Sequence, residues 1–291
     1  MPVSTVLTCG NLNKTYGRTF ALRNLSLQLQ ENVIYGMLGR NGAGKTTLLN
    51  MIAGGILPDS GTLEVWGKRL RKGELPRDFC YVRDHTSPFG GARVMEVLQF
   101  AASFHPNWAW PLAHELLETF RIDPRKKMSQ LSRGTAALVG NIIGLASRAA
   151  LTLYDEPVLG LDVLMREKFY KALLEDYAAH PRTILLSTHL IDEIAPVVEQ
   201  VFIIEAGSVL LHDEMDLIRM GAHMLRGKSE AVAAFTAGKR VIHTEAYGRG
   251  TLAAMYEQLT EEDFTRAREL DIAIEGLTLQ KFFAYLVEGG Q

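Results

Sequence analysis

The sequence Gly39-Arg40-Asn41-Gly42-Ala43-Gly44-Lys45-Thr46 matches the phosphate-binding pattern G-x-x-x-x-G-K-[ST], the P-loop, at every fixed position. Its glycines let the backbone adopt positive φ and approach phosphate oxygens closely. The N–H groups of such a loop, together with the N-terminus of the helix that follows, form an anion cradle. In this chemistry Lys45 reaches the β- and γ-phosphates and the Thr46 hydroxyl ligates Mg²⁺.

The flanking sequence has the strand–loop–helix pattern that a P-loop requires. Val33–Leu38 is predicted to be a buried strand and Thr47–Ile52 a helix. Short strands alternate with helices up to about Leu211, which is typical of a layered α/β domain. Two nearly continuous apolar runs, Leu151–Tyr154 and Thr183–Ser187, are typical of central parallel strands.

An antiparallel part and a helical part are also predicted. Leu25–Gln30 and Gly61–Trp66 alternate apolar and polar residues, which favours half-exposed antiparallel strands. Helical patterns dominate from about residue 85 to 147 and indicate an insertion between two core strands. The candidate helices of this insertion are residues 94–104, 110–120 and 133–147.

After residue 212 the sequence predicts a small α+β accessory domain. It should contain strands at 222–226, 240–246, 251–256 and 272–274, and helices at 229–235, 261–270 and 278–287. We therefore expect a P-loop α/β domain over residues 1–212 and an accessory domain over residues 213–291.

Composition limits the class of protein. The chain has 291 residues, 47% of them hydrophobic, and a net charge of −2, so we expect a globular protein without general affinity for nucleic acids. Cys9 and Cys80 have no metal or redox spacing and are expected to be reduced thiols. The charge-free stretch Gly134–Ser147 is too short to span a bilayer. We therefore expect any membrane-spanning part to come from other chains.

Two adjacent acids follow the apolar run that begins at Leu151. Asp155 stands where a Mg²⁺-binding carboxylate belongs, and Glu156 can hold and polarise an attacking water. Adjacent acids at the end of a strand point in different directions, which allows two roles.

Over roughly residues 5–212 the chain resembles the ATP-binding cassette (ABC) ATPases. Leu131-Ser132-Arg133-Gly134-Thr135 resembles the family signature L-S-G-G-Q, and Asp155-Glu156-Pro157 with Gly160-Leu161-Asp162 resembles D-E-P-x-x-G-L-D. Ser187-Thr188-His189 resembles the switch-histidine segment, and Tyr16 matches the aromatic residue that stacks on adenine. The motifs occur in the order and spacing of the family.

The resemblance implies two domains that face each other head to tail and bury two ATP molecules between them. Each ATP would lie between the P-loop of one domain and Ser132 and Gly134 of the other. Glu156, His189 and Lys45 would be catalytic, and Asp162 would link the two sites. The implied nucleotide contacts are Tyr16, Gly39, Asn41, Gly42, Ala43, Gly44, Lys45, Thr46, Thr47, Ser132, Gly134 and Asp162. The implied Mg²⁺ ligands are Thr46, Asp84 and Asp155.

Three positions depart from the family pattern. Asp84 stands where a glutamine is usual; a carboxylate still binds Mg²⁺ as a hard oxygen donor. In the signature, Arg133 replaces the first glycine and Thr135 replaces glutamine, which predicts a weaker contact across the dimer.

The leading hypothesis is the ATP-hydrolysing subunit of a membrane transporter of exporter type, working with separate membrane-spanning subunits and a second ABC subunit. Such a protein would be cytoplasmic and peripheral at the inner face of the cell membrane. The alternative hypothesis is a soluble ABC-type ATPase that acts as a regulatory or mechanical module. The sequence names no transported substrate and leaves the role of residues 213–291 open.

Overall fold

A computed structural model describes residues 4–71, 73–83 and 90–289. The chain divides into two compact units. The first runs through His189 and includes Ile204–Val209; the second comprises Leu190–Ile203 and Leu210–Gln291. The second unit thus takes in residues 190–203, which precede the boundary that the sequence predicts at residue 212.

Three buried parallel strands form the centre of the first unit. Every residue of β3 (Ile34–Leu38), β7 (Leu151–Asp155) and β8 (Thr183–Thr188) is buried. β8 pairs in parallel with both β3 and β7, and β7 pairs with β6 (Phe79–Arg83). The apolar runs that predicted central strands are confirmed, because strands buried on both faces need apolar side chains on both.

The strand order of this larger sheet is β10-β9-β3-β8-β7-β6, with β9 at Gln200–Glu205 and β10 at Ser208–Glu214. The hairpin between β9 and β10 supports the P-loop. The Gly207 N–H donates to the Ala43 carbonyl at 3.1 Å, and the Gly207 carbonyl accepts from the Arg23 N–H at 2.8 Å.

A second, antiparallel sheet also belongs to the first unit, with the order β2-β1-β4-β5. In β2 the alternate residues Leu25, Leu27 and Leu29 are buried, as the period-2 pattern predicted. β1 carries several register irregularities against β2, which its sequence does not signal. The bounds are β1 Thr5–Tyr16, β2 Thr19–Gln30, β4 Ser60–Val65 and β5 Lys68–Arg69.

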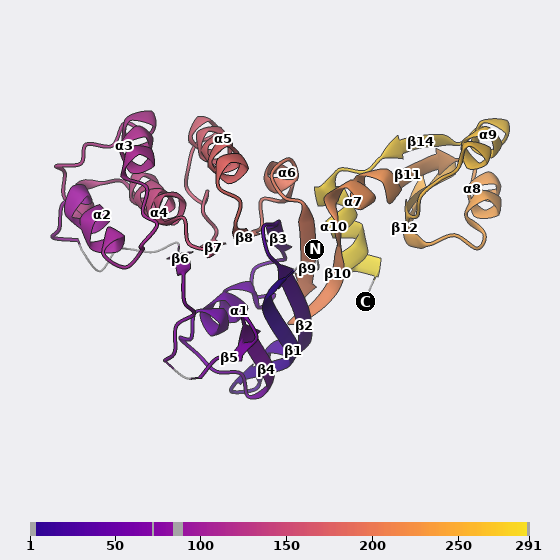
Figure 1. The fold of residues 1–291 in the computed structure, drawn as a ribbon. Helices are drawn as coiled ribbons and strands as arrows, with labels where there is room; N and C mark the ends of the chain where they lie inside the picture. The colour runs from indigo at the N-terminus through magenta and orange to yellow at the C-terminus, as the bar shows by residue number, and fades with distance from the viewer. Residues whose placement is uncertain (1–3, 72, 84–89, 290–291) are drawn as a thin grey trace. The chain divides into compact units, whose positions relative to one another are not determined.

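The predicted helical insertion lies between β6 and β7, where α2, α3 and α4 lie together (Figure 1). Gly144 allows α4 to approach β7, since a Cβ there would lie 2.6 Å from the Tyr154 hydroxyl. The helices of the first unit are α1 Lys45–Ile52, α2 Val94–Ala102, α3 Trp110–Thr119, α4 Arg133–Ser147 and α5 Val163–Ala179, with a 3₁₀ turn at Met128–Gln130. The predicted α/β class with its antiparallel subdomain is confirmed.

The second unit contains an antiparallel sheet of order β12-β13-β11-β14. Strands and helices alternate as β11-α8-β12-β13-α9-β14, which is the ferredoxin-like arrangement. Leu225, Phe235 and Met255 belong to the core between this sheet and its helices. The elements are α6 Ile191–Ile194, α7 Met215–Gly221, β11 Ala222–Gly227, α8 Ser229–Thr236, β12 Val241–Tyr247, β13 Gly250–Tyr256, α9 Glu261–Glu269, β14 Ala273–Gly276 and α10 Leu279–Gly289.

Candidate functional site

The P-loop connects the carboxyl end of β3 to the N-terminus of α1. Gly42 and Gly44 have φ of 85° and 106°, a region that favours glycine. A Cβ at Gly44 would lie 2.3 Å from the carbonyl oxygen of Ala21 and 2.8 Å from Leu22. The loop is therefore shaped by glycines, with its backbone packed against the antiparallel sheet.

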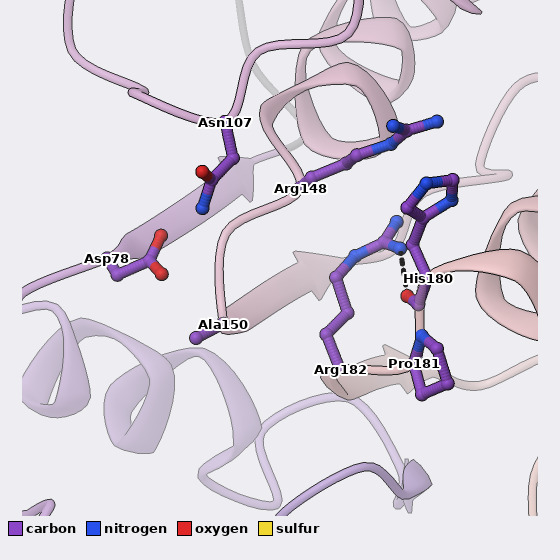
Figure 2. A pocket seen from close by; sticks show the side chains of 7 residues that line it. All are labelled: Asp78, Asn107, Arg148, Ala150, His180, Pro181 and Arg182. Carbon is purple, nitrogen blue, oxygen red and sulfur yellow. Dashed lines mark hydrogen bonds between the residues drawn. The ribbon is translucent and has the colours of Figure 1, made fainter.

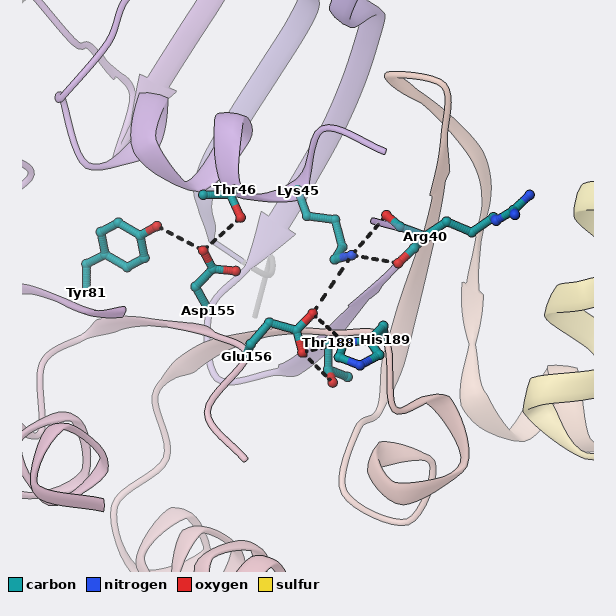
Figure 3. Close-up of polar contacts among 9 residues, drawn as sticks. Arg40, Lys45, Thr46, Tyr81, Asp155, Glu156, Thr188 and His189 are labelled. Atoms are coloured by element: carbon teal, nitrogen blue, oxygen red, sulfur yellow. Dashed lines mark hydrogen bonds and ion pairs between the residues drawn. The ribbon is translucent and has the colours of Figure 1, made fainter. Parts of the chain in front are cut away.

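Lys45 begins α1 and is only 7% exposed. Its Nζ donates to the carbonyl oxygens of Gly39 and Arg40 at 2.6 and 3.3 Å and lies 4.0 Å from Glu156 Oε1 (Figure 3). Burial lowers the pKa of Lys45, and the charges of Glu156 and Asp155 oppose that shift. The ammonium group thus lies inside the loop that the sequence assigns to phosphates.

Asp155 at the end of β7 meets the other end of the P-loop. Its Oδ2 accepts from the Thr46 hydroxyl at 2.9 Å and lies 3.5 Å from the Tyr81 hydroxyl (Figure 3). Its Oδ1 is buried and has no hydrogen-bond partner among the described residues. Burial is the main cause that raises the pKa of Asp155, and the charge of Glu156 adds to it.

This pair of oxygen ligands fits a Mg²⁺ ion. Mg²⁺ prefers hard oxygen donors and is held in proteins by one or two carboxylates together with phosphates. A hydroxyl and a carboxylate with an unpartnered buried oxygen supply such donors. Asp84, the third predicted ligand, lies outside the described residues.

Glu156 lies between Lys45 and the end of β8. Its carboxylate contacts His189 Nδ1 at 2.9 Å through each oxygen, and its Oε2 accepts from the Thr188 hydroxyl at 3.1 Å. Its backbone has φ of 52°, and its N–H donates to the Ser187 carbonyl at 2.8 Å. A carboxylate held in this way can accept a proton or orient a water.

The contacts among the described residues join Lys45, Thr46, Asp155, Glu156 and His189 at the carboxyl ends of β3, β7 and β8 (Figure 3). Parallel strands place their carboxyl ends at one edge of the sheet, and ligands of open α/β sheets bind at that edge. The residues that the sequence predicted to be catalytic are therefore neighbours in the fold.

The remaining predicted P-loop residues lie along the loop and the first turn of α1. Gly39 and Ala43 are buried, Asn41 and Gly42 are exposed, and Thr47 is half-buried. Tyr16, at the end of β1, is 51% exposed, with Lys14 Nζ 5.7 Å from its ring centroid.

The predicted signature residues Ser132 and Gly134 lie at one helix N-terminus, and Asp162, which is predicted to link the two sites, lies at another. Ser132 is the N-cap of α4, and Gly134 lies in the first turn of that helix. Asp162 caps α5 by accepting from the Met165 N–H at 2.9 Å. A Cβ at Gly134 would lie 2.8 Å from the Gly160 carbonyl, so these two segments pack closely. Both helix ends present N–H groups, which favour an anion.

Two contributors to the cluster, Tyr81 and Thr188, were not predicted from the sequence. The Thr188 hydroxyl contacts Glu156, and the Tyr81 hydroxyl lies near Asp155. Thr188 stands between two residues of the predicted switch segment, so its position was a usable signal. Tyr81 lies in β6, and no motif in the sequence marked it as part of the site.

A cavity of about 420 Å³ lies at the opposite edge of the sheet, at the amino ends of β6, β7 and β8 (Figure 2). Its lining includes Asp78, Ala150 and Arg182. Arg182 is paired with the buried carboxylate of Asp176 at 2.8 Å. This cavity is separate from the Lys45–Glu156 cluster, and Arg182 in its lining is already engaged in a structural ion pair.

A P-loop at the end of a buried parallel strand, with a lysine, a hydroxyl and two acids around it, defines a P-loop nucleoside-triphosphatase. The family model described as ABC transporter matches residues 22–159. The chain is 30% identical over 220 residues to the uncharacterized ABC transporter ATP-binding protein MJ1023 of Methanocaldococcus jannaschii, covering 74% of this chain and 80% of that protein. The chain belongs to the ABC transporter ATP-binding proteins, and it is an ATPase.

Two further comparisons agree. The chain is 29% identical over 212 residues to the bacitracin transport ATP-binding protein BcrA of Bacillus licheniformis, covering 72% of this chain and 69% of that protein. A solved structure of the ATP-binding subunit of an ABC transporter matches with a TM-score of 0.65 and 25% identity, covering 74% of this chain and 92% of that one. Within residues 4–71, 73–83 and 90–289, no helix is both long and apolar enough to cross a membrane.

Proposed function

We propose that this protein supplies the energy of ATP hydrolysis to a membrane exporter. In this proposal it works as one half of a head-to-tail nucleotide sandwich, bound to separate membrane-spanning subunits at the inner face of the cell membrane. The observation that carries the proposal is the cluster of Lys45, Thr46, Asp155, Glu156 and His189 at one sheet edge. The name of BcrA, a bacitracin transport protein, supports transport.

Each side chain has a role that follows from its contacts. Lys45 is positioned to neutralise the β- and γ-phosphates, and the P-loop N–H groups hold them. Thr46 and Asp155 would hold Mg²⁺, which when bound neutralises charge on the phosphate oxygens. Glu156 orients the attacking water and takes its proton, while His189 and Thr188 fix the direction of the Glu156 carboxylate.

The signature residues Ser132 and Gly134 complete the site of a partner subunit. Ser132 and Gly134 present a hydroxyl and backbone N–H groups at the exposed N-terminus of α4, and Asp162 caps the neighbouring α5. In a head-to-tail dimer the Ser132 hydroxyl and the Gly134 N–H would meet the γ-phosphate held by the other subunit, which makes closure depend on ATP, and Asp162 would link the two sites.

Glu156→Gln tests the sandwich. The amide keeps the shape of the carboxylate but cannot take a proton, so ATP should bind without turnover and hold the dimer closed. On a sizing column the variant should elute as a dimer with Mg·ATP and as a monomer with Mg·ADP. Lys45→Ala is the control that should lose both ATP binding and the dimer. A variant that stays monomeric with ATP contradicts the sandwich.

Transport and its direction need the native complex. Affinity capture from the source membrane should retrieve chains with apolar spans of about 20 residues. Vesicles carrying that complex, with the ATPase domain outside, should accumulate substrate inside when ATP is added if the protein drives export. Retrieval of only soluble partners would favour the alternative of a regulatory or mechanical ATPase.

A further inference from the structure

The first turn of α4 carries two hydroxyl groups in contact. Ser132 Oγ accepts from the Thr135 backbone N–H at 3.2 Å and lies 2.8 Å from Thr135 Oγ1, where either oxygen can be the donor. Ser132 is exposed and Thr135 is half-buried. The serine hydroxyl is thus held by the backbone and by the side chain of the same residue.

The hydrogen-bonding capacity of a serine limits how this pair can be arranged. A hydroxyl has one proton to donate and two lone pairs to accept with. The Thr135 N–H occupies one lone pair of Ser132. If the Thr135 hydroxyl occupies the other, the Ser132 proton is left to point outward; if Ser132 donates to Thr135, no proton remains for an outside acceptor.

An anion at this helix end would select between the two arrangements. A phosphate oxygen is a charged acceptor and competes better for the Ser132 proton than a neutral hydroxyl does. The Thr135 hydroxyl can then reverse and donate to Ser132, so that Ser132 keeps both acceptor sites filled. A chain of two such bonds polarises each member and strengthens the outer one.

We propose that Thr135 is a positioning residue that makes the Ser132 hydroxyl a donor to the γ-phosphate of ATP bound by a second copy of this chain. The inference rests on the proposed sandwich dimer. It gives a function to Thr135, the residue that stands where the signature pattern has glutamine. The contact across the dimer then depends on residue 135 through its hydroxyl and not only through its backbone.

The helix cap itself does not need the threonine hydroxyl. The cap uses the N–H of residue 135, which valine also supplies. Thr135→Val has the same branched shape and removes only the hydroxyl, and Thr135→Ser keeps the hydroxyl without the methyl group. The two variants form a matched pair that separates hydrogen bonding from helix capping.

The experiment measures the ATP concentration that gives half-maximal dimer in the Glu156→Gln background, by light scattering. Adding Thr135→Val should raise that concentration by about three- to tenfold, the range expected for one lost hydrogen bond. Adding Thr135→Ser should leave it close to that of the Glu156→Gln parent. The affinity of the monomer for ADP should be the same in all three proteins, because ADP has no γ-phosphate for Ser132 to meet.

The outcomes distinguish this inference from the proposal beneath it. If Glu156→Gln alone forms no dimer with ATP, the sandwich fails. If it does form one and Thr135→Val equals Thr135→Ser, the role of Thr135 fails. If Thr135→Val also weakens ADP binding, or lowers the unfolding temperature without nucleotide, the residue is structural and the inference is overturned.

Discussion

Lys45 and Asp155 are charged side chains that the fold buries, being 7% and 8% exposed. Burial lowers the pKa of Lys45 and raises that of Asp155, which means that each charged form is less stable here than in water. Such shifts cluster at functional sites, since charges needed for a ligand are held where that ligand will compensate them. Phosphates and Mg²⁺ would be the compensating charges for these two residues.

Asp155→Asn should stabilise the protein without nucleotide, by an amount that depends on pH. Because the pKa of Asp155 is raised from its ordinary value of 3.8, the folded state binds more protons than the unfolded state just above that pH. The free energy of unfolding therefore falls as pH rises through the raised pKa. Asparagine does not titrate, so its advantage in the free energy of unfolding should be small near pH 4 and should grow as pH rises toward 7.

Denaturant unfolding of both proteins at several pH values measures this difference. With Mg·ATP present the parent should become the more stable of the two proteins, because Asp155→Asn loses a metal ligand. A difference that stays constant from pH 4 to 7 would show that ionisation of Asp155 carries no cost in the folded state.

At the scale of elements, the sequence pattern predicted well the strands and helices that depend on local hydrophobic periodicity. The apolar runs of β3, β7 and β8 and the full length of α4 follow from burial and helical period. The meeting of Lys45, Asp155 and Glu156 was implied by the motifs and the family resemblance, and the shared edge of the parallel strands brings it about. The irregular pairing of β1 with β2 and the order β12-β13-β11-β14 did not follow, since they depend on long-range register.

Side-chain contacts that depend on rotamers could not be predicted from the sequence either. The Lys45 bonds to carbonyls of its own loop and the Thr188 bond to Glu156 are examples. Residue type and spacing place these side chains in one region but leave several staggered conformations open to each. The cluster was therefore predictable as a set of residues, and its hydrogen bonds were not.

α9 offers a prediction at this scale, because its start combines a cap with an ion pair. Thr260 and Asp263 form a capping box, and Lys239 Nζ lies 2.8 Å from Asp263 Oδ1. The Lys239 contact, with help from the Thr260 N–H, lowers the pKa of Asp263 to about 2. The stabilisation is therefore present above the ordinary value of 3.8 and is lost as pH falls toward 2.

Asp263→Asn keeps an acceptor for the cap and removes the charge. It should cost about 1 kcal/mol at pH 7, the upper range for an ion pair near the surface. Hydrogen exchange of the α9 amides in the full chain measures this loss of stability. The difference in free energy between Asp263→Asn and the parent should shrink at low pH. Glu262→Gln, which removes an exposed charge from the same turn, is the control. Equal effects of the two variants would mean that the Lys239 contact contributes nothing.

At the scale of the whole molecule, the division into two compact units separates nucleotide binding from the ferredoxin-like sheet. Lys45, Thr46, Asp155, Glu156 and His189 all belong to the first unit. The core of the ferredoxin-like part of the second unit, which includes Leu225, Phe235 and Met255, is made from its own strands and helices. A ligand that binds only to folded residues of one unit stabilises that unit by mass action and leaves an independent unit unchanged.

Calorimetry of the full chain should therefore show two unfolding transitions, of which Mg·ATP shifts only one. Glu156→Gln is the protein to use, because it should not consume the ATP during the scan. At about 100 times the dissociation constant, the ligand adds about 2.7 kcal/mol to the first unit. For a unit of this size that corresponds to a rise of about 5–11 °C in its unfolding temperature.

Lys45→Ala should show both transitions with no shift, because it lacks the phosphate contact. A single transition that moves as a whole would mean that the two units unfold together, so that nucleotide binding is coupled to the second unit.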